Sequence, residues 1–459
     1  MIVLRPPIQL SLDLPEPGWG EAPRPDGRET ETIAAMSGPE SPTEVRSLME
    51  TICDPDNMTA ALRAVVRNKG AAGVDRMTVR RLPDAMKERW PEIERQLLEG
   101  RYRPTPVLRV RIPKPSGGTR DLGIPTAIDR VIQQAVLQRL QPLWDPTFSE
   151  HSFGFRPGRS AHQAVAKAQS FVAEGHRFVV DIDLSKFFDR VNHDRLMARL
   201  AARVTDRRVL VLIRSFLTAG VMDEGVFEAS EEGTPQGGPL SPLLSNIVLD
   251  ELDRELERRG HRFVRYADDC NVYVRGERAG LRVMASLTRF IEGRLRLKIN
   301  AEKSAVARPW DRSFLGFTVT EETEPRRRIA DKAVRRFKDR ARELTRRHGR
   351  ALERMIAELN PYLRGWAGYF GFTQWRELAS LDGWIRRRLR CAVWVQWRTR
   401  GRRYKELRRL GVSEKVASAA IFSPKGPWRL SSAGALHRAF TNRRFQGLGL
   451  VAMEKLTFA

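Results

Sequence analysis

The stretch HRFVRYADDCNVYVR, residues 261–275, decides the expected fold. Apolar residues flank the acidic pair Asp268-Asp269 on both sides, which predicts two antiparallel strands joined by a tight turn. A second apolar run, HRFVVDIDL at residues 176–184, predicts a buried strand that ends with two more carboxylates, Asp181 and Asp183. An acidic pair at a turn is by itself usually solvated. Here the flanking strands would anchor the turn in a sheet and hold its carboxylates at the rim.

Carboxylates from the two segments suit one kind of chemistry. If both strand ends meet at the same edge of the sheet, their carboxylates converge. Like charges at short distance repel, so such a group is stable only when it binds cations. Two Mg²⁺ ions held about 4 Å apart stabilise both the attacking and the leaving oxygen in phosphoryl transfer. The pattern therefore predicts a metal-dependent phosphoryl-transfer site.

The distribution of charge indicates a polyanionic partner. The 459 residues include 81 Lys and Arg against 56 Asp and Glu, a net charge of +25. Residues 325–459 hold 33 basic and 10 acidic residues, so nearly all of the excess lies there, together with six of the ten tryptophans. Basic residues interleaved with large aromatics favour a surface that follows a phosphate backbone. Most of these tryptophans are nevertheless expected to lie in the core.

Composition excludes several classes of protein. With 41% hydrophobic residues the chain can bury substantial cores, so wholesale disorder is excluded. The sequence contains no apolar run of about 18 residues that would span a membrane and no N-terminal secretion pattern. The three isolated cysteines, Cys53, Cys270 and Cys391, supply neither a disulfide framework nor a zinc site. They favour a reducing, cytosolic setting.

Periodicity gives a coarse order of elements. Residues 1–40 are rich in proline and nearly aperiodic, so a disordered extension is expected, with Met36 as an alternative start. A basic hairpin is expected over 107–125 and a short strand over 313–319. Helices are expected over 43–66, 84–98, 127–140, 192–217, 240–259, 331–347, 350–359, 376–398 and 402–409. The composition changes near 320–330, which predicts a domain boundary.

Several long motifs occur in a fixed order along the chain. They are NKGAAGVDRMTV (68–79), IPKPSGGTRDLGIPTAIDRVIQQAV (112–136), FSEHSFGFRPGRSAHQAV (148–165), VVDIDLSKFFDRVNHDRL (179–196), EGTPQGGPLSPLLSNIVLDELD (232–253), RYADDC (265–270), LRLKINAEKS (295–304), SFLGF (313–317) and NPYLRGWAGYF (360–370). This ordered set resembles the bacterial group II intron-encoded reverse transcriptases, or intron maturases. The resemblance covers about residues 43 to 450.

The resemblance implies an α+β right-hand polymerase fold. Fingers and a palm with an antiparallel sheet would be followed by an all-α basic thumb, called domain X, and a small basic C-terminal domain. The implied divisions are a disordered extension (1–40), an N-terminal extension with a lid loop (41–105), fingers and palm (106–324), thumb or domain X (325–400) and a DNA-binding segment (401–459).

The family's metal-binding strand aspartate stands five residues before an aromatic residue that selects the sugar. Asp183 has that spacing to Phe188, so the resemblance implies Asp183, Asp268 and Asp269 as catalytic ligands of two Mg²⁺ ions. Asp181 would then have a structural or electrostatic role. Phe188 would exclude a 2′-hydroxyl.

Because Phe187 stands beside Phe188, only the alternation of side chains along the backbone decides which ring faces the site. The resemblance also implies dNTP contacts by Lys114 and Arg120 of the basic hairpin and by Gln236 in the TPQGG motif. Lys303 matches a lysine that donates a proton to pyrophosphate in polymerases of this broad class, with a solvated lysine as the alternative.

The implied function is RNA-directed DNA polymerisation, combined with assistance to intron splicing and mobility. The implied partners are intron RNA, an RNA template–DNA primer duplex, target DNA and dNTPs, in the bacterial cytosol or nucleoid and without a membrane. The chain shows no cysteine pairs or clustered histidines of an HNH endonuclease, so a type without that domain is expected. A domesticated enzyme of DNA repair or phage defence, a splicing-only RNA-binding cofactor and a DNA-templated repair polymerase remain as alternatives.

Overall fold

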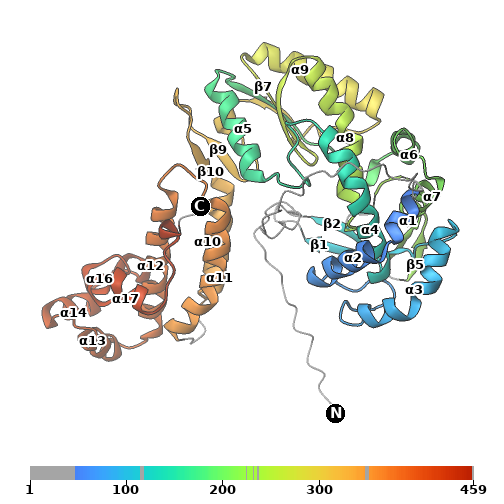
Figure 1. Cartoon of the computed structure of the whole chain (residues 1–459). Helices are drawn as coiled ribbons and strands as arrows, with labels where there is room; N and C mark the ends of the chain where they lie inside the picture. Colours follow the sequence, from blue (N-terminus) through green and yellow to red (C-terminus); the bar gives the residue numbers. More distant parts are fainter. Residues whose placement is uncertain are drawn as a thin grey trace, which may run out of the picture. The chain divides into compact units, whose positions relative to one another are not determined.

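The computed structural model describes residues 47–113, 118–223, 225–230, 232–234, 237–346 and 351–456 (Figure 1). Residues 1–40, Lys114 and Gln236, about which the sequence made predictions, lie outside these ranges. Contacts between residues divide the described chain into two compact units. The N-terminal unit comprises residues 47–171 and 175–307, and the C-terminal unit comprises residues 308–456 with 172–174.

Three helices open the N-terminal unit: α1 (Leu48–Cys53), α2 (Pro55–Arg67) and α3 (Leu82–Leu98). The prediction of one helix over 43–66 was wrong, because the chain breaks between α1 and α2. Asp54 has non-helical backbone, and its side chain accepts hydrogen bonds from the amides of Asp56 and Asn57. Pro55 occupies the first position of α2, where its missing N–H costs nothing. An Asp-Pro pair therefore starts a new helix here.

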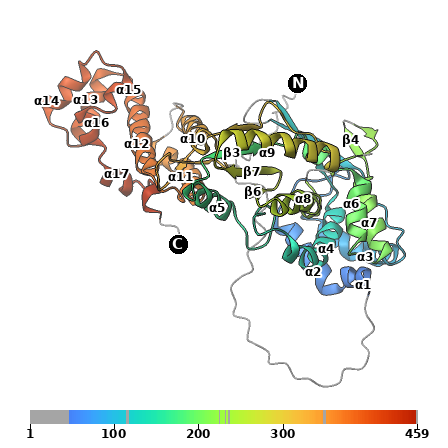
Figure 2. The same ribbon diagram turned by 90° about the horizontal axis from the view of Figure 1, so that it is seen from above.

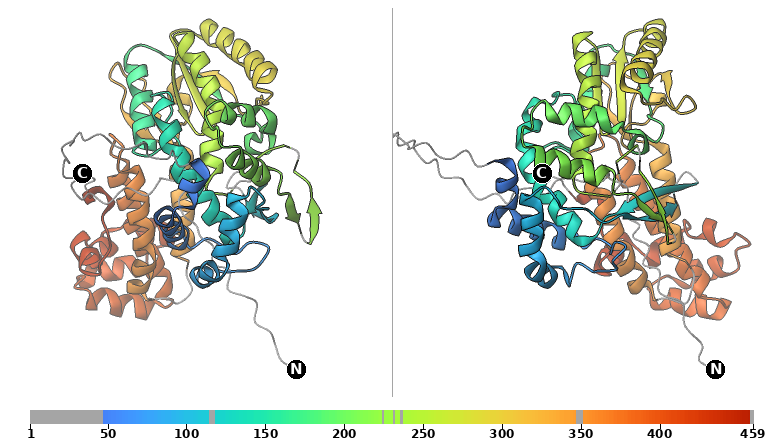
Figure 3. Two further views of the ribbon diagram at one scale, coloured as in Figure 1. Left: turned by 45° about the vertical axis from the view of Figure 1, so that its right-hand side comes forward. Right: turned by 90° about the vertical axis from the view of Figure 1, so that its right-hand side faces the viewer.

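The first sheet contains the basic hairpin, β1 (Val107–Pro113) and β2 (Thr119–Ile124), and the short pair β4 (Val221–Asp223) and β5 (Val226–Glu228). The strand order is β2-β1-β4-β5, with β1 parallel to β4. Arg109 on β1 joins the two pairs, because its guanidinium lies 3.0 Å from Asp223 and 2.8 Å from Glu228. The β4–β5 pair, in green, projects from the unit (Figure 3).

The second sheet carries the predicted carboxylates. It consists of β3 (Phe178–Ile182), β6 (Arg262–Tyr266), β7 (Asp269–Val274) and β8 (Ala305–Ala307) in the order β6-β7-β3-β8, and every neighbouring pair is antiparallel. Alternation sends Val180, Ile182, Cys270 and Val272 into the hydrophobic core. The opposite face carries Asp181, which is paired in register with Asn271.

Helices α8 (Ser241–Arg258) and α9 (Glu277–Phe290) cover the apolar face of this sheet. Figure 2 shows α9 lying along the sheet beside β3 and β7. Gly280 permits this close packing, since a Cβ there would lie 2.5 Å from Val306 and 3.4 Å from Val274. The remaining helices of the unit are α4 (Ala127–Trp144), α5 (Ala161–Ala173), α6 (His193–Ala201) and α7 (Arg207–Leu217), with short turns at Asp145–Thr147, Phe187–Arg190 and Ile291–Leu295.

The C-terminal unit is mostly helical. It contains the hairpin β9 (Phe317–Val319) and β10 (Arg327–Ile329), a short turn at Pro309–Asp311, α10 (Asp331–Leu344), α11 (Leu352–Phe370), α12 (Glu377–Gln396), α13 (Arg400–Arg409), α14 (Glu414–Ile421), α15 (Pro427–Leu430), α16 (Gly434–Ala439), α17 (Asn442–Gly447) and a final turn at Met453–Lys455. The contacts divide the units at residue 308 instead of near 320–330. The reason is that Phe317 of the hairpin packs on Tyr369 and Phe370 of α11, with ring centroids 5.6 and 5.3 Å apart.

Helix α11 extends well past the predicted end at 359. Pro361 lies inside it and lacks the N–H for one helical hydrogen bond. The helix continues because Leu359, Leu363, Trp366 and Phe370 form one buried apolar stripe. Burial of that stripe outweighs the local cost of the proline.

The six tryptophans of residues 325–459 differ in burial. Trp366, Trp394 and Trp397 are buried, Trp384 is half-buried, and Trp375 and Trp428 are 41% and 38% exposed. The expectation that most of them lie in the core therefore holds for only part of the set. None of the helices in the described ranges combines the length and apolar composition that a membrane crossing requires.

Candidate active site

The acidic turn is a two-residue connection between β6 and β7. Tyr266 pairs in register with Asp269, which leaves Ala267 and Asp268 as the turn. Ala267 has a φ of +57°, the left-handed region that non-glycine residues rarely adopt. Gly154 packs directly on this backbone, since a Cβ there would lie 2.2 Å from the Ala267 nitrogen. The turn is thus held in one conformation by a neighbouring segment.

Asp183 reaches the same sheet edge from β3. Ile182 pairs with Cys270, so the next residue, Asp183, follows at the level where β7 begins. The Asp183 amide donates to Ser304 Oγ at 3.0 Å, and its carbonyl accepts from the Asn300 amide at 2.8 Å. These bonds to a segment more than a hundred residues later fix the backbone that carries the Asp183 carboxylate.

The pKa of Asp268 depends on charges from two other strands, β2 and β6, and on Asp183. Burial raises the pKa of Asp268, and the charge of Asp183 raises it further. Arg120 on β2 and Arg265 on β6 oppose this rise. The charges of Asp183 and Arg120 therefore lie near enough to Asp268 to act on its pKa.

Lys303 lies beside the metal-binding candidate on β3. Its Nζ is 3.7 Å from Asp183 Oδ2, and its side chain is 66% exposed. The ammonium is therefore both close to the reacting region and open to solvent. The structure places Lys303 beside Asp183, and its role as a proton donor stays a prediction.

The two neighbouring phenylalanines differ in burial. Phe187 is 2% exposed and belongs to the hydrophobic core. Phe188 is only half-buried and packs edge-on against Phe187, with ring centroids 5.2 Å apart. The alternation that the sequence left open therefore leaves Phe188 as the accessible ring.

The glycines that follow the predicted dNTP contact Gln236 pack against protein. A Cβ at Gly237, which has a φ of +133°, would lie 2.8 Å from the Gly123 carbonyl. A Cβ at Gly238 would lie 2.3 Å from Gln133 Oε1. These glycines let the loop approach β2 and α4 closely.

Sequence reasoning missed the residue that supports the acidic turn. Arg265 on β6 is fully buried and donates to both carboxylate oxygens of Asp253 on α8, at 2.7 and 2.6 Å. It also donates to Asn246 Oδ1, Ser152 Oγ and the Ala267 carbonyl, at 2.9, 2.7 and 2.8 Å. An arginine inside an apolar strand was the available signal, because a buried charge requires a partner.

The carboxylates form a suitable donor set for a hard cation. Mg²⁺ is bound in enzymes mostly by one or two carboxylates together with substrate phosphates. In the described ranges, no three His, Cys, Asp or Glu side chains form a ready-made group of metal ligands. The donor chemistry of Asp183 and Asp268 therefore fits a cation that substrate phosphates help to bind.

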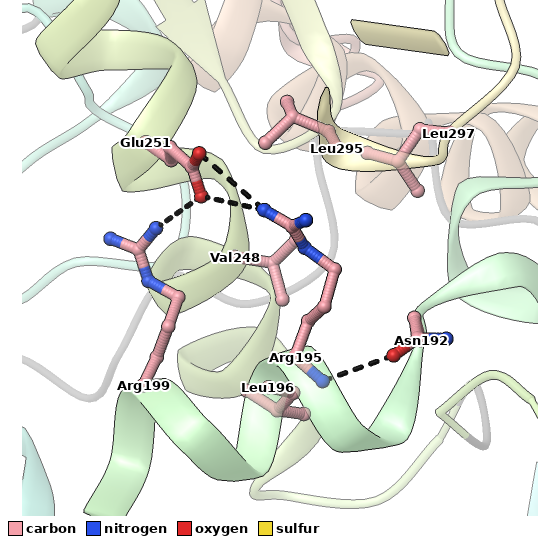
Figure 4. Close-up of a pocket in the computed structure, with 8 residues that line it drawn as sticks. All are labelled: Asn192, Arg195, Leu196, Arg199, Val248, Glu251, Leu295 and Leu297. Atoms are coloured by element: carbon pink, nitrogen blue, oxygen red, sulfur yellow. Dashed lines mark hydrogen bonds and ion pairs between the residues drawn. The ribbon is translucent and has the colours of Figure 1, made fainter. Parts of the chain in front are cut away.

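A separate pocket lies on the helical side of the N-terminal unit (Figure 4). Glu251 of α8 accepts there from Arg195 and Arg199 of α6, at 3.2 and 2.8 Å. The pocket contains none of the predicted catalytic residues, and its ion pairs join α6 to α8. It is lined by Asn192, Arg195, Leu196, Arg199, Val248, Glu251, Leu295 and Leu297.

Comparison with known proteins identifies two domain families. Residues 112–319 match the family described as reverse transcriptase (RNA-dependent DNA polymerase), and residues 334–411 match the group II intron, maturase-specific domain. Protein YkfC of Escherichia coli (strain K12) is 32% identical over 314 residues, which cover 60% of this chain and 82% of YkfC. The group II intron-encoded protein LtrA of Lactococcus lactis subsp. cremoris is 29% identical, over 58% of this chain and 55% of LtrA. Among solved structures, a partial Cas6-RT-Cas1–Cas2 complex matches at 23% identity over 58% of this chain and 46% of its own, with a TM-score of 0.36.

These matches agree with the architecture. The reverse transcriptase match begins near the end of β1 and includes the whole second sheet and the acidic turn, and the maturase match begins within α10 and ends after α13. The predicted α+β polymerase fold with a helical C-terminal region is confirmed, and the matches do not favour the splicing-only or repair alternatives. Enzymes of this family generally use divalent metal ions. The chain belongs to the reverse transcriptases of group II introns, which are RNA-directed DNA polymerases with a maturase domain.

Proposed function

We propose that this chain extends a DNA primer on an RNA template, using Asp183, Asp268 and Asp269 as ligands of two Mg²⁺ ions. The observation that carries the proposal is the meeting of three distant elements. Asp183 follows β3, Asp268 lies in the β6–β7 turn, and both the Asp183 carboxylate and the Arg120 guanidinium of β2 act on the pKa of Asp268. A carboxylate pair opposed by a basic hairpin suits a substrate that brings both phosphates and cations.

In the proposed reaction the primer 3′-oxygen attacks the α-phosphorus of a dNTP, the bond to the β-phosphate oxygen breaks, and pyrophosphate leaves. Bound divalent cations would supply stabilisation of the charge on the attacking and leaving oxygens. The carboxylates of Asp183, Asp268 and Asp269 would hold these cations. Arg120, with Lys114, neutralises the triphosphate as the charge on its leaving oxygen grows.

Two further side chains act on the nucleotide. In this proposal the half-buried ring of Phe188 stacks on the sugar of the dNTP and excludes a 2′-hydroxyl by steric contact. Lys303, whose Nζ lies 3.7 Å from Asp183, donates a proton to the leaving pyrophosphate. Gln236 contacts the incoming nucleotide.

The C-terminal unit carries a surface suited to RNA and DNA. Arg387 of α12 stacks on the exposed ring of Trp428 at 4.2 Å, and Arg342 of α10 lies 5.5 Å from the ring of Trp384. Stacked aromatics among cations bind nucleobases and phosphates together. We assign intron RNA, the template–primer duplex and target DNA as the partners. These partners place the protein in the bacterial cytosol or nucleoid.

Primer extension on an RNA template with Mg²⁺ tests the proposal. Asp268→Asn removes a metal ligand but keeps the shape of the turn. The extension rate should fall at least about 100-fold, because even partners of metal ligands cost 10–100-fold when replaced. Binding of intron RNA should stay at the wild-type level. The exposed Asp84→Asn on α3 is the matched control and should extend normally. Equal loss of extension and of RNA binding would show that Asp268 is structural and would contradict the proposal.

A further inference from the structure

The backbone of Phe188 is bonded to a distant loop. The Thr234 amide donates to the Phe188 carbonyl at 2.6 Å, and the Gly233 amide donates to the Val191 carbonyl at 2.9 Å. A Cβ at Gly233, which has a φ of +91°, would lie 2.8 Å from the Phe188 carbonyl oxygen. Residues 233–234 and the segment that carries the accessible phenylalanine therefore pack as one unit, and any shift of the loop shifts Phe188.

A buried histidine also binds this loop. His193 is 3% exposed, and its Nε2 lies 2.6 Å from the Gly233 carbonyl oxygen. A carbonyl only accepts hydrogen bonds, so Nε2 carries the hydrogen. Burial lowers the pKa of His193, which keeps the imidazole neutral near pH 7. The Thr234 hydroxyl has no partner among the described residues, so the bonds on this loop are made by its backbone.

His193 lies on a helix that is held in place by other contacts. It is the first residue of α6, and the Asn192 side chain caps that helix by accepting from the Arg195 amide at 3.0 Å. Arg195 and Arg199 tie α6 to Glu251 of α8 (Figure 4). A rigid helix thus presents one N–H donor to the loop that rests on Phe188.

We propose that His193 is a positioning residue for the nucleotide sugar, which acts by holding the Gly233 carbonyl and, through Thr234, the backbone of Phe188. It deepens the proposed function, since it rests on Phe188 as the residue that excludes a 2′-hydroxyl. A steric gate works only when its ring is held to a fraction of an ångström. Without the His193 hydrogen bond, the loop and Phe188 can shift together away from the nucleotide sugar.

Two variants of similar size separate the effect of the His193 hydrogen bond from the effect of side-chain volume. His193→Gln places an N–H donor at nearly the reach of Nε2, whereas His193→Asn places its donor one methylene short. His193→Asn should raise the KM for dNTP and the relative kcat/KM for rNTP by roughly 10-fold each, in the range of residues that support functional groups indirectly. His193→Gln should restore most of both. Thermal unfolding of the two variants reports any general loss of stability.

The outcomes distinguish this proposal from the one on which it rests. Phe188→Ala, measured in parallel, should admit ribonucleotides. If Phe188→Ala relaxes sugar selection and His193→Asn does not, His193 only stabilises the fold and this inference is overturned. If His193→Gln is as impaired as His193→Asn, the Nε2 hydrogen bond is not the cause, which also overturns it. If Phe188→Ala leaves sugar selection unchanged, the gate assignment itself fails.

Discussion

Replacing Arg265 with methionine removes the side chain that supports the acidic turn. Arg265 and its partner Asp253 are both fully buried, and the guanidinium donates to both carboxylate oxygens of Asp253. The methionine keeps much of the volume but leaves a buried carboxylate without its cation. It also removes a hydrogen bond from the Ala267 carbonyl, beside Asp268. Stability and polymerisation should therefore fall together.

The expected loss is large because the pair is completely buried. Breaking a buried ion pair by removing one partner costs about 3–5 kcal/mol, since an uncompensated charge remains. For a domain of this size, each kcal/mol shifts the melting temperature by about 2–4 °C, so a fall of roughly 6–20 °C is expected. Arg265→Lys should recover only part of this loss, because lysine cannot form the two parallel bonds to the carboxylate.

Urea unfolding and thermal melts measure the effect. The matched control is Arg258→Met on α8, whose side chain is 69% exposed and pairs with Glu255 at 2.8 Å. An exposed pair contributes about 0–1 kcal/mol, so this variant should unfold near the wild type. The double variant Arg265→Met with Asp253→Leu should regain most of the lost stability, since no lone charge remains.

Two results would refute this reasoning. A loss below about 1 kcal/mol for Arg265→Met would mean that the pair behaves as if it were exposed. A double variant as unstable as the single one would mean that the buried carboxylate is not the source of the loss.

Three other measurements address separate features of the chain. Lys303→Ala should slow nucleotide addition more than it raises the KM for dNTP. Lys303→Arg should restore little of the rate if Lys303 donates a proton. Equal rates for the wild type and both variants would show that Lys303 is a solvated lysine. Hydrogen bonds from Arg208 hold the pKa of Glu50 at about 2, against an ordinary value of 4.5, so the attachment of α1 should persist above about pH 4.5 and weaken as the pH falls toward 2. Limited proteolysis across this range detects the release, and Arg208→Met should abolish the pH dependence. Trp428→Ala should weaken binding of single-stranded RNA by roughly 5- to 100-fold, and wild-type affinity should fall steeply with salt. Anisotropy titrations that show no change would contradict a nucleic-acid role for this surface.

Local patterns were sufficient for the elements that carry the chemistry. Alternating apolar residues around Asp268 identified β6 and β7, and the apolar run before Asp183 identified β3. Strand pairing follows from such patterns because side chains alternate between the two faces of a sheet. The same local rules failed where packing competes with propensity. A helix was predicted to end at residue 359, but α11 continues through Pro361 to Phe370 because its apolar stripe is buried.

The sequence by itself determined the chemical inventory: the carboxylates at the strand ends, the basic hairpin, the basic and aromatic C-terminal third, and the family through the order of its motifs. Only the tertiary structure decided which phenylalanine is accessible and which residues support the site. Arg265 contacts Ser152, His193 contacts Gly233 and Lys303 contacts Asp183, although each pair is far apart in the sequence. These contacts arise when separate helices and strands pack around one core, and residue spacing along the chain does not encode the distances that result.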